Sequence, residues 1–320
     1  MFSLCSPCPL GEQLFKTCHT EVWRSQVFLN VPAMRYVIIL PNGKKRVKSM
    51  FEMPETITYA LPERIGNTDL FVGRKKEFDY YLGDWYYYLV NNMARSQAIV
   101  ARRRKGKTAF LERLFNILWS CSGNKVIPFF YVMQERQITL ASFAKDFFAT
   151  FVSHYLSFLT RNKDWVLSPL NYMEMKKYIT QYPDLYKKSI SIDEFEKTGN
   201  WDLMWSVARR TPFDIAVSTG VKVVQIIDEF QNINAYIVNE RGKTIDSMSG
   251  AYRDLAERKE APLIVSGSEV HRLLEILCRL TAGFAENVLE NLPEEEAKEA
   301  VWKYAQATDT RIDEHAVEKI

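Results

Sequence analysis

Stretches of continuous apolar residues alternate with amphipathic stretches along most of the chain after residue 69. Apolar runs that suit buried strands occur at residues 97–101, 125–133, 221–228, 261–266 and 286–291. Between these runs, apolar residues recur every three or four positions, as they do on one face of a helix. The pattern therefore predicts a three-layer α/β domain over residues 69–292, in which helices cover both faces of a parallel sheet.

Residues 140–200 contain two stretches with different patterns. Apolar residues recur at helical spacing from Leu140 to Leu159, which predicts a long helix. We assign this stripe to the core or to a subunit contact rather than to a ligand site. Residues 161–200 mix Pro, Tyr, Lys and Asp without a sustained period, so we expect an insertion with short helices there.

The N-terminal residues lack this alternation. Residues 1–33 show no helical or strand period over a useful length, whereas a clear structural signal begins directly after Met34. We therefore expect residues 1–33 to form a disordered leader, or to be an artefact of the choice of start site.

A β-hairpin and a linker are expected over residues 34–68. Two strand-like runs, at residues 35–40 and 44–51, flank Asn42-Gly43, a turn sequence that readily adopts positive φ. The stretch at 54–67, with its prolines and polar residues, then forms the linker. The hairpin also carries a basic cluster of Lys44, Lys45, Arg46 and Lys48. A solvated hairpin edge explains this cluster more simply than a nucleic-acid contact does.

Composition narrows the function classes. Of the 320 residues, 47% are hydrophobic and 25% are charged, which is ordinary for a globular protein with a sizeable core. The net charge of +3 is too small to indicate a nucleic-acid partner by itself. The sequence contains neither the run of about 18 apolar residues that a spanning helix needs nor a signal-peptide pattern. We therefore expect a cytoplasmic protein without a membrane segment.

The five cysteines form an odd and scattered set, which favours a reducing compartment. Cys5 and Cys8 have the spacing of a zinc-ligand pair, and Cys18 and His19 are further candidate ligands. However, Cys18 and His19 are adjacent, and no second pair at ligand spacing follows. We therefore favour free thiols over a zinc site.

The clearest chemical signal is the stretch Ala-Arg-Arg-Arg-Lys-Gly-Lys-Thr, which joins an apolar strand to an amphipathic helix. In this layout, backbone N–H groups of the loop and of the helix N-terminus point at phosphates. Lys107 can reach the β- and γ-phosphates of a nucleotide, and the Thr108 hydroxyl can bind Mg²⁺. The expected phosphate-binding residues are Ala101, Arg102, Arg103, Arg104, Lys105, Gly106, Lys107, Thr108 and Ala109.

Ala101 departs from the usual phosphate-loop pattern, which begins with glycine. Alanine is excluded at this position only if the backbone there needs a positive φ. The alternative interpretation is a basic loop before an ordinary surface helix. The strand and the helix on either side of the loop favour the phosphate-binding interpretation.

A second motif begins at Val221 and ends at Gln231. An apolar strand carries Asp228 and Glu229 at its carboxyl end, which is where ligands bind in open α/β sheets. Asp228 can hold Mg²⁺ opposite Thr108, while Glu229 can polarise the attacking water. Two adjacent carboxylates also fit an ordinary surface, but the loop upstream favours a catalytic pair.

The sequence Phe71-Val-Gly-Arg-Lys-Lys-Glu77 lies about thirty residues before the phosphate loop. A box of this type, followed by Arg-Arg-Arg-x-Gly-Lys-Thr, is similar to the AAA+-related P-loop ATPases of the archaeal-ATPase and STAND group. The resemblance implies that Phe71, Val72 and Gly73 wall the adenine site. The alternative is that the box is a turn at the start of the aromatic helix that follows it.

The resemblance also implies several structural features. The strand order becomes 5-1-4-3-2, and the strand at 261–266 lies beside the phosphate-loop strand and carries a γ-phosphate sensor, Ser266 or Ser268. A serine at the start of a helix is equally suited to be an N-cap, so both interpretations stay open. Residues 293–320 resemble the start of a helical lid, in which Pro293 and the acidic residues after it open a helix.

The function implied is that of an ATP-binding and ATP-hydrolysing molecular switch that requires Mg²⁺. The alternatives are a nucleotide-binding interaction module that cycles slowly or not at all and, with least support, a DNA-associated ATPase. The expected partners are ATP and either a second copy of the chain or a protein effector. Arg279 lies where AAA+ proteins often place an arginine finger for the neighbouring subunit, and Arg272 and Arg258 are weaker candidates. A solvated helix face also explains all three arginines.

Overall fold

The computed structural model describes residues 35–39, 45–49, 51–121, 126–280 and 283–317. At its centre lies a parallel sheet with the strand order β9-β3-β8-β6-β4. When the strands are numbered along the chain, this order is 5-1-4-3-2, as expected. The strands are β3 (Ser96–Val100), β4 (Val126–Val132), β6 (Lys222–Asp228), β8 (Leu263–Gly267) and β9 (Phe284–Val288). The three-layer α/β fold with a parallel sheet in this order is the one predicted from the sequence.

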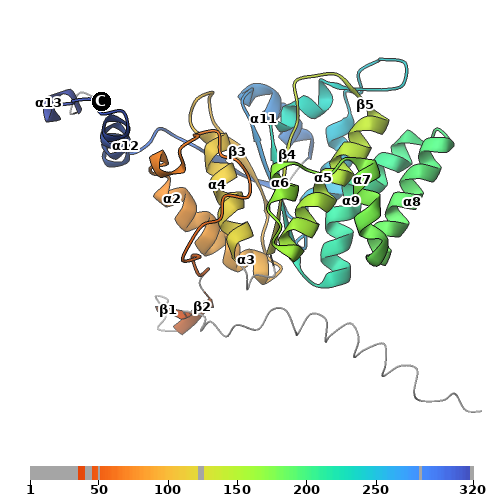
Figure 1. Cartoon of the computed structure of the whole chain (residues 1–320), viewed down its shortest axis with the longest axis horizontal. Helices are drawn as coiled ribbons and strands as arrows, with labels where there is room; N and C mark the ends of the chain where they lie inside the picture. The colour runs from red at the N-terminus through yellow and green to blue at the C-terminus, as the bar shows by residue number, and fades with distance from the viewer. Residues whose placement is uncertain (1–34, 40–44, 50, 122–125, 281–282, 318–320) are drawn as a thin grey trace, which may run out of the picture.

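Helices pack on both faces of the sheet. Figure 1 shows α4 (Lys107–Ser120) on one side and α5 (Leu140–Thr160) and α9 (Trp201–Thr219) on the other. The long helix predicted from the apolar stripe at residues 140–159 is α5, and the stripe is buried in the core of this chain. β4 lies at one edge of the sheet, yet almost all of its residues are buried, because α4 and α5 both pack on it.

The aromatic stretch after the box forms one continuous helical segment, residues 75–90. It consists of α2 (Lys75–Phe78), a π-helical stretch η2 (Asp79–Trp85) and α3 (Tyr86–Val90). Phe78 and Tyr81 of this segment pack against Phe110 of α4, with ring centroids 4.8 and 5.5 Å apart. The helical segment 75–90 therefore packs against the first turn of α4, which follows the phosphate loop.

The region at 161–200 is more regular than expected. It contains α6 (Asp164–Leu167), α7 (Tyr172–Tyr178), the 3-10 turn η3 (Ile179–Gln181) and α8 (Pro183–Lys197). The expectation of short helices is wrong for α8, which has 15 residues and packs against α9. That this region is an insertion in a smaller fold stays a prediction.

The last strand begins earlier than predicted, since β9 starts two residues before the predicted run. The segment before β8 is a 3-10 turn η5 (Met248–Tyr252) followed by α10 (Arg253–Ala256). Helix α11 (Val270–Leu280) follows β8. The expected helix after Pro293 is α12 (Glu294–Ala307), and α13 (Glu314–Val317) follows it.

The predicted hairpin strands are β1 (Arg35–Ile39) and β2 (Lys45–Ser49), which pair antiparallel. The turn at Asn42-Gly43, the leader at residues 1–33, and the candidate zinc ligands Cys5, Cys8, Cys18 and His19 lie outside the described residues. None of the helices in the described ranges has the length and apolar character needed to cross a membrane.

The linker after the hairpin lies along α4. The side-chain amide of Asn116 accepts a hydrogen bond from Leu61 N (2.8 Å) and donates one to Leu61 O (2.9 Å). Arg113 pairs with Glu63 through both of its carboxylate oxygens, at 2.7 and 2.9 Å. The linker is therefore ordered and is bound along the helix that begins at the phosphate loop.

Candidate nucleotide site

The phosphate loop leaves β3 at Val100 and ends where α4 begins at Lys107. Gly106, the N-cap of α4, has a φ of 76°, a conformation that glycine adopts without strain. Arg104 has a φ of 64°, whereas Ala101 does not lie in the positive-φ region. Alanine is therefore tolerated at the first position of the loop, and the strained position of the loop is Arg104 instead.

Lys107 is buried, with 6% of its surface exposed, and its Nζ donates a hydrogen bond to Ala101 O at 3.1 Å. Burial lowers the pKa of Lys107 from its usual value, although the negative charges of Glu229 and Asp228 oppose the shift. The ammonium group of Lys107 is thus bound by the backbone of its own loop. By contrast, Arg102, Arg103 and Arg104 are exposed.

Thr108 and Asp228 meet in the structure although 120 positions separate them in the sequence. The Thr108 hydroxyl donates to Asp228 Oδ2 at 2.7 Å. The other oxygen, Oδ1, accepts hydrogen bonds from the Ser266 hydroxyl and from Glu229 N. Asp228 is fully buried, so these donors replace the water that an ionised carboxylate would otherwise need.

Ser266 reaches Asp228 because β8 lies between β3 and β6 in the sheet. As expected, this strand lies beside the phosphate-loop strand, and Ser266 is in register with Ile99 of β3. Ser268, the second sensor candidate, is directed at Glu229 instead. Its backbone N–H and its hydroxyl both donate to Glu229 Oε2, at 3.0 and 2.8 Å.

Glu229 is held tightly at the end of β6. It has a φ of 55°, and its Oε2 also accepts a hydrogen bond from Gln231 Nε2 at 2.6 Å. Burial raises the pKa of Glu229, but the hydrogen bonds from Gln231 and Ser268 and the charge of Lys107 outweigh that effect. The pKa therefore lies below its usual value, and the group is a carboxylate at neutral pH.

Gln231 is a site residue that the sequence analysis missed. It is 2% exposed, and its Oε1 has no hydrogen-bond partner among the described residues. Gly267 makes room for it, because a Cβ at that position would collide with Gln231 Oε1. The available signal was the position of Gln231 in the same short motif as Asp228 and Glu229.

The box residues lie beside α4. Phe71 packs on Phe78, with ring centroids 5.9 Å apart, and the Arg113 guanidinium lies 4.4 Å from the centre of the Phe71 ring. Gly73 has a φ of 81° and ends the turn that leads into the helical segment 75–90. The box is thus the start of the aromatic helix, and the role of Phe71, Val72 and Gly73 in an adenine site stays a prediction.

Arg74 in the same box is a second residue to which the sequence analysis assigned no role. It is 6% exposed, and its guanidinium donates to Lys105 O of the phosphate loop at 2.6 Å and to Glu290 O at 2.9 Å. It also pairs with Glu77 of the box at 3.1 Å. The box therefore contacts the phosphate loop directly, through its arginine.

The finger candidates do not join this cluster. Arg279 is exposed in the last turn of α11, and within the described ranges no hydrogen bond or ion pair connects its side chain to the phosphate loop or to Asp228 or Glu229. Arg272 pairs with Glu269 at 2.9 Å, and the Arg258 guanidinium lies 5.0 Å from the centre of the Phe213 ring. A finger role for Arg279 stays a prediction.

The oxygen donors of the cluster fit Mg²⁺ better than a transition metal. The described part of the chain contains no group of three or more His, Cys, Asp or Glu side chains that could hold a metal ion. Mg²⁺ is normally bound by one or two protein oxygens together with nucleotide phosphates and water. The Thr108 hydroxyl and the Asp228 carboxylate are a donor set of that kind.

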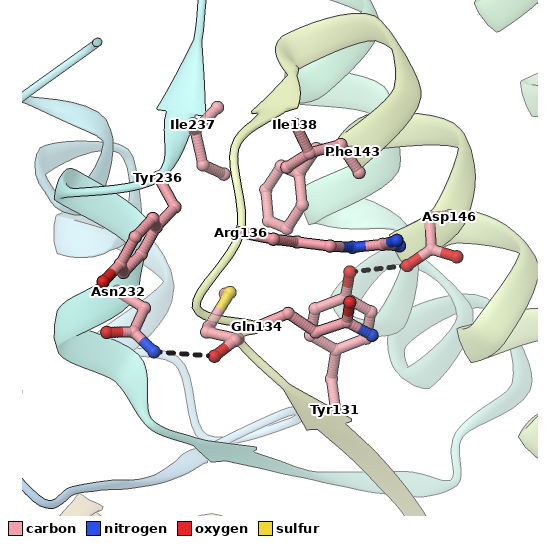
Figure 2. A pocket seen from close by; sticks show the side chains of 10 residues that line it. Tyr131, Gln134, Arg136, Ile138, Phe143, Asp146, Asn232, Tyr236 and Ile237 are labelled. Carbon is pink, nitrogen blue, oxygen red and sulfur yellow. Dashed lines mark hydrogen bonds between the residues drawn. The ribbon is translucent and has the colours of Figure 1, made fainter.

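A small pocket lies next to this site, at the end of β4 (Figure 2). Tyr131 and Asp146, joined by a 2.7 Å hydrogen bond, form part of its wall together with Asn232 of the 3-10 turn η4 (Phe230–Asn234). Asn232 donates to Met133 O at 2.8 Å. The phosphate-loop residues, Asp228 and Glu229 do not line this pocket, so it is separate from the candidate nucleotide site.

No family model and no curated protein matches the sequence. The chain is similar to the Walker-type ATPase PABY2304 of Pyrococcus abyssi, with 15% identity and a TM-score of 0.49 over 81% of this chain and 63% of that one.

Two further structures come from Aeropyrum pernix. The ORC1 protein in complex with DNA is 12% identical, with a TM-score of 0.42 over 78% of this chain and 53% of that one. The ORC2 protein in its ADP form is 13% identical, with a TM-score of 0.37 over 79% and 55%. This chain thus spans less than two thirds of each of these three structures. Similarities this low transfer no site residue and no activity.

Proposed function

We propose that this chain binds ATP with Mg²⁺ and hydrolyses it, acting as a molecular switch. The observation that carries the proposal is the hydrogen bond between Thr108 and Asp228, beside the buried Lys107. It joins the end of the phosphate loop to the acidic end of β6 at one edge of a parallel sheet, where ligands bind in such folds.

The roles follow from the positions of the side chains. Lys107 and the N–H groups of the first turn of α4 would hold the phosphates. Thr108 and Asp228 would hold Mg²⁺, which neutralises phosphate charge when bound. Glu229 would orient the attacking water and accept its proton, and its ionised state at neutral pH supports this role. Ser268 and Gln231 keep its carboxylate in place.

The test is phosphate release from ATP by the full chain, with Mg²⁺ and with EDTA. We expect turnover with Mg²⁺ and none with EDTA. Binding of a fluorescent ATP analogue without turnover would instead favour the alternative, a nucleotide-binding interaction module. Absence of binding would contradict both.

We further propose that turnover depends on self-association. An arginine that meets the γ-phosphate in the transition state raises the rate by about 10³ to 10⁵. Arg279 is exposed and therefore available to a second copy of the chain. The rate per subunit should rise with protein concentration and fall in Arg279→Ala. A flat rate over a hundredfold dilution, with unaltered activity in Arg279→Ala, would remove this idea and leave the ATP site intact.

A further inference from the structure

The acidic start of α12 makes an unusual contact with the box. The two carboxylate oxygens of Glu296 accept hydrogen bonds from Arg74 N at 2.8 Å and from Lys75 N at 3.3 Å. Glu296 is 9% exposed, whereas its neighbours Glu294 and Glu295 point to solvent. Figure 1 shows α12 beside α2.

These two N–H groups belong to the start of the helical segment 75–90. The first N–H groups of a helix have no partner within it, and a carboxylate there also interacts favourably with the helix dipole. Arg74, the N-cap residue of α2, supplies no side-chain cap of its own. Glu296 therefore caps this helix from a distant part of the chain.

The approach of Glu296 depends on Gly73. A Cβ at Gly73 would lie 2.5 Å from Glu296 Oε2 and 2.9 Å from Leu292 Cδ2. Since real Cβ atoms do not approach other atoms so closely, only glycine permits this contact. Close packing therefore accounts for glycine at position 73, whether or not the box contacts a ligand.

Arg74 connects Glu296 to the phosphate loop. Its backbone N–H binds Glu296, while its guanidinium binds Lys105 O. Its φ of 63° is strained for a residue with a side chain, so this arrangement needs external support. The Lys105 side chain, in turn, donates to Asn291 Oδ1 just before α12. Lys105 lies two positions before Lys107 and next to the strained Arg104.

We propose that Glu296 is a positioning residue that couples α12 to the phosphate loop through Arg74, so that the seating of α12 sets how firmly the loop holds ATP. This inference rests on the proposed function and names a means of regulating that same site. When the cap is lost, Arg74 loses its backbone anchor, and the Lys105 carbonyl and the strained loop are free to relax.

The effect is measured as the dissociation rate of a fluorescent ATP analogue with Mg²⁺, displaced by excess ATP in a stopped-flow instrument. Glu296→Ala should speed dissociation on the order of tenfold, within the usual range of coupling between sites. Glu296→Gln keeps one oxygen acceptor and should give an intermediate rate. The matched control is Glu295→Ala, an exposed glutamate one position away, which should dissociate like the wild type.

A double-mutant cycle separates coupling from a general loss of packing. Arg74→Lys removes the forked contact, so if Glu296 acts through Arg74, the double variant should dissociate no faster than the faster single variant. Independent, multiplying effects would overturn the proposed route. Melting temperatures of all variants identify any that fail to fold, and Glu296→Gln then serves as the test.

The outcomes distinguish the two proposals. If the wild type does not bind the analogue, the proposed function fails and the coupling fails with it. If the wild type binds and Glu296→Ala dissociates at the wild-type rate, the coupling is overturned and the ATP site stands.

Discussion

The carboxyl edge of the sheet and the aromatic layer around α5 are both buried, but they are built from different contacts. In the aromatic layer the Phe147 ring lies 5.1 Å from those of Phe129 and Tyr131 and 5.3 Å from that of Trp205, measured between centroids. At the sheet edge, buried polar groups such as Lys107 and Asp228 depend on specific hydrogen-bond partners.

Positive φ occurs at the end of α5, at its C-cap Arg161, but more often around the sheet edge. Arg74, Arg104 and Glu229 all have positive φ, and all three belong to the nucleotide site or to its support. Such conformations persist only where the surrounding structure enforces them. The aromatic layer therefore stabilises the fold, and this stabilisation offsets the free-energy cost of the strained polar arrangement at the sheet edge.

The largest expected effect lies at the sheet edge. Glu229→Gln keeps the shape of the side chain but removes the proton acceptor, so ATP turnover should fall by about 10² to 10⁴ while nucleotide affinity stays near wild type. Phosphate release and analogue binding are measured on the same preparations. The control is Glu240→Gln, an exposed glutamate on the surface. Equal turnover of Glu229→Gln and wild type would rule out Glu229 as the base.

The converse experiment targets the aromatic layer. Phe147 is fully buried, so Phe147→Ala should lower the free energy of unfolding by about 3 to 5 kcal/mol. The folded fraction should still bind ATP with near wild-type affinity. Urea unfolding measures the free energy of unfolding, and titration with the fluorescent analogue measures the nucleotide affinity. The control is Met173→Ala, at a side chain that is 70% exposed. A specific loss of affinity in folded Phe147→Ala would break the division between the two regions.

Sequence patterns could predict the sheet and the Thr108–Asp228 pair because each depends on local signals. The apolar runs mark the strands, and the carboxyl ends of parallel strands meet at one edge. By contrast, Arg74, Gln231 and Glu296 bind through contacts that no local pattern encodes. The hydrogen bond from Arg74 to Glu296 spans 222 positions, and its need for glycine at residue 73 is visible only in three dimensions.

Helix α9 could not be predicted from the local pattern either. Pro212 lies inside it and interrupts the helical pattern, although Met204, Ala208, Thr211 and Ile215 are buried at helical spacing. The strands β5 (Ile138–Thr139) and β7 (Ile237–Val238) were missed because two residues are too few to show a period. The positive φ at Arg104 was not predicted, since the sequence does not tell which loop residue adopts that conformation.

Glu112 on α4 accepts a hydrogen bond from Arg64 N of the linker at 2.7 Å and should make the stability depend on pH. Burial raises its pKa to about 7, although hydrogen bonding and charge from Arg64 oppose the shift. The folded state then binds the proton more tightly than the unfolded state, so stability should fall as the pH rises from about 4.5 to about 7.

Glu112→Gln removes this titration. Relative to wild type, the variant should gain up to about 3 kcal/mol between pH 5 and pH 8, as a pKa shift of this size implies. Urea unfolding at several pH values measures the two slopes, with the exposed Glu257→Gln as control. Parallel slopes for Glu112→Gln and wild type would contradict this account of Glu112.

The smallest predicted effect concerns the strained loop. Arg104→Gly should raise the free energy of unfolding by about 0.5 to 1 kcal/mol, because glycine adopts positive φ without strain but gives up some chain entropy. The neighbouring Arg103, also exposed, does not have positive φ, so Arg103→Gly should lower stability slightly. Thermal unfolding compares the pair. Stabilisation by both variants, or by neither, would contradict strain at Arg104.

The central claim is that the loop ending at Lys107 binds nucleotide, and calorimetric titration of wild type and Lys107→Ala with ATP and Mg²⁺ tests it most directly. Lys107 is the buried cation of the loop, and losing its charged hydrogen bonds should weaken binding by about a hundredfold. Lys187→Ala, at an exposed position on α8, should bind like the wild type. We predict saturable binding by the wild type and binding about a hundredfold weaker by Lys107→Ala; equal affinities of these two proteins, or no binding by the wild type, would contradict the account.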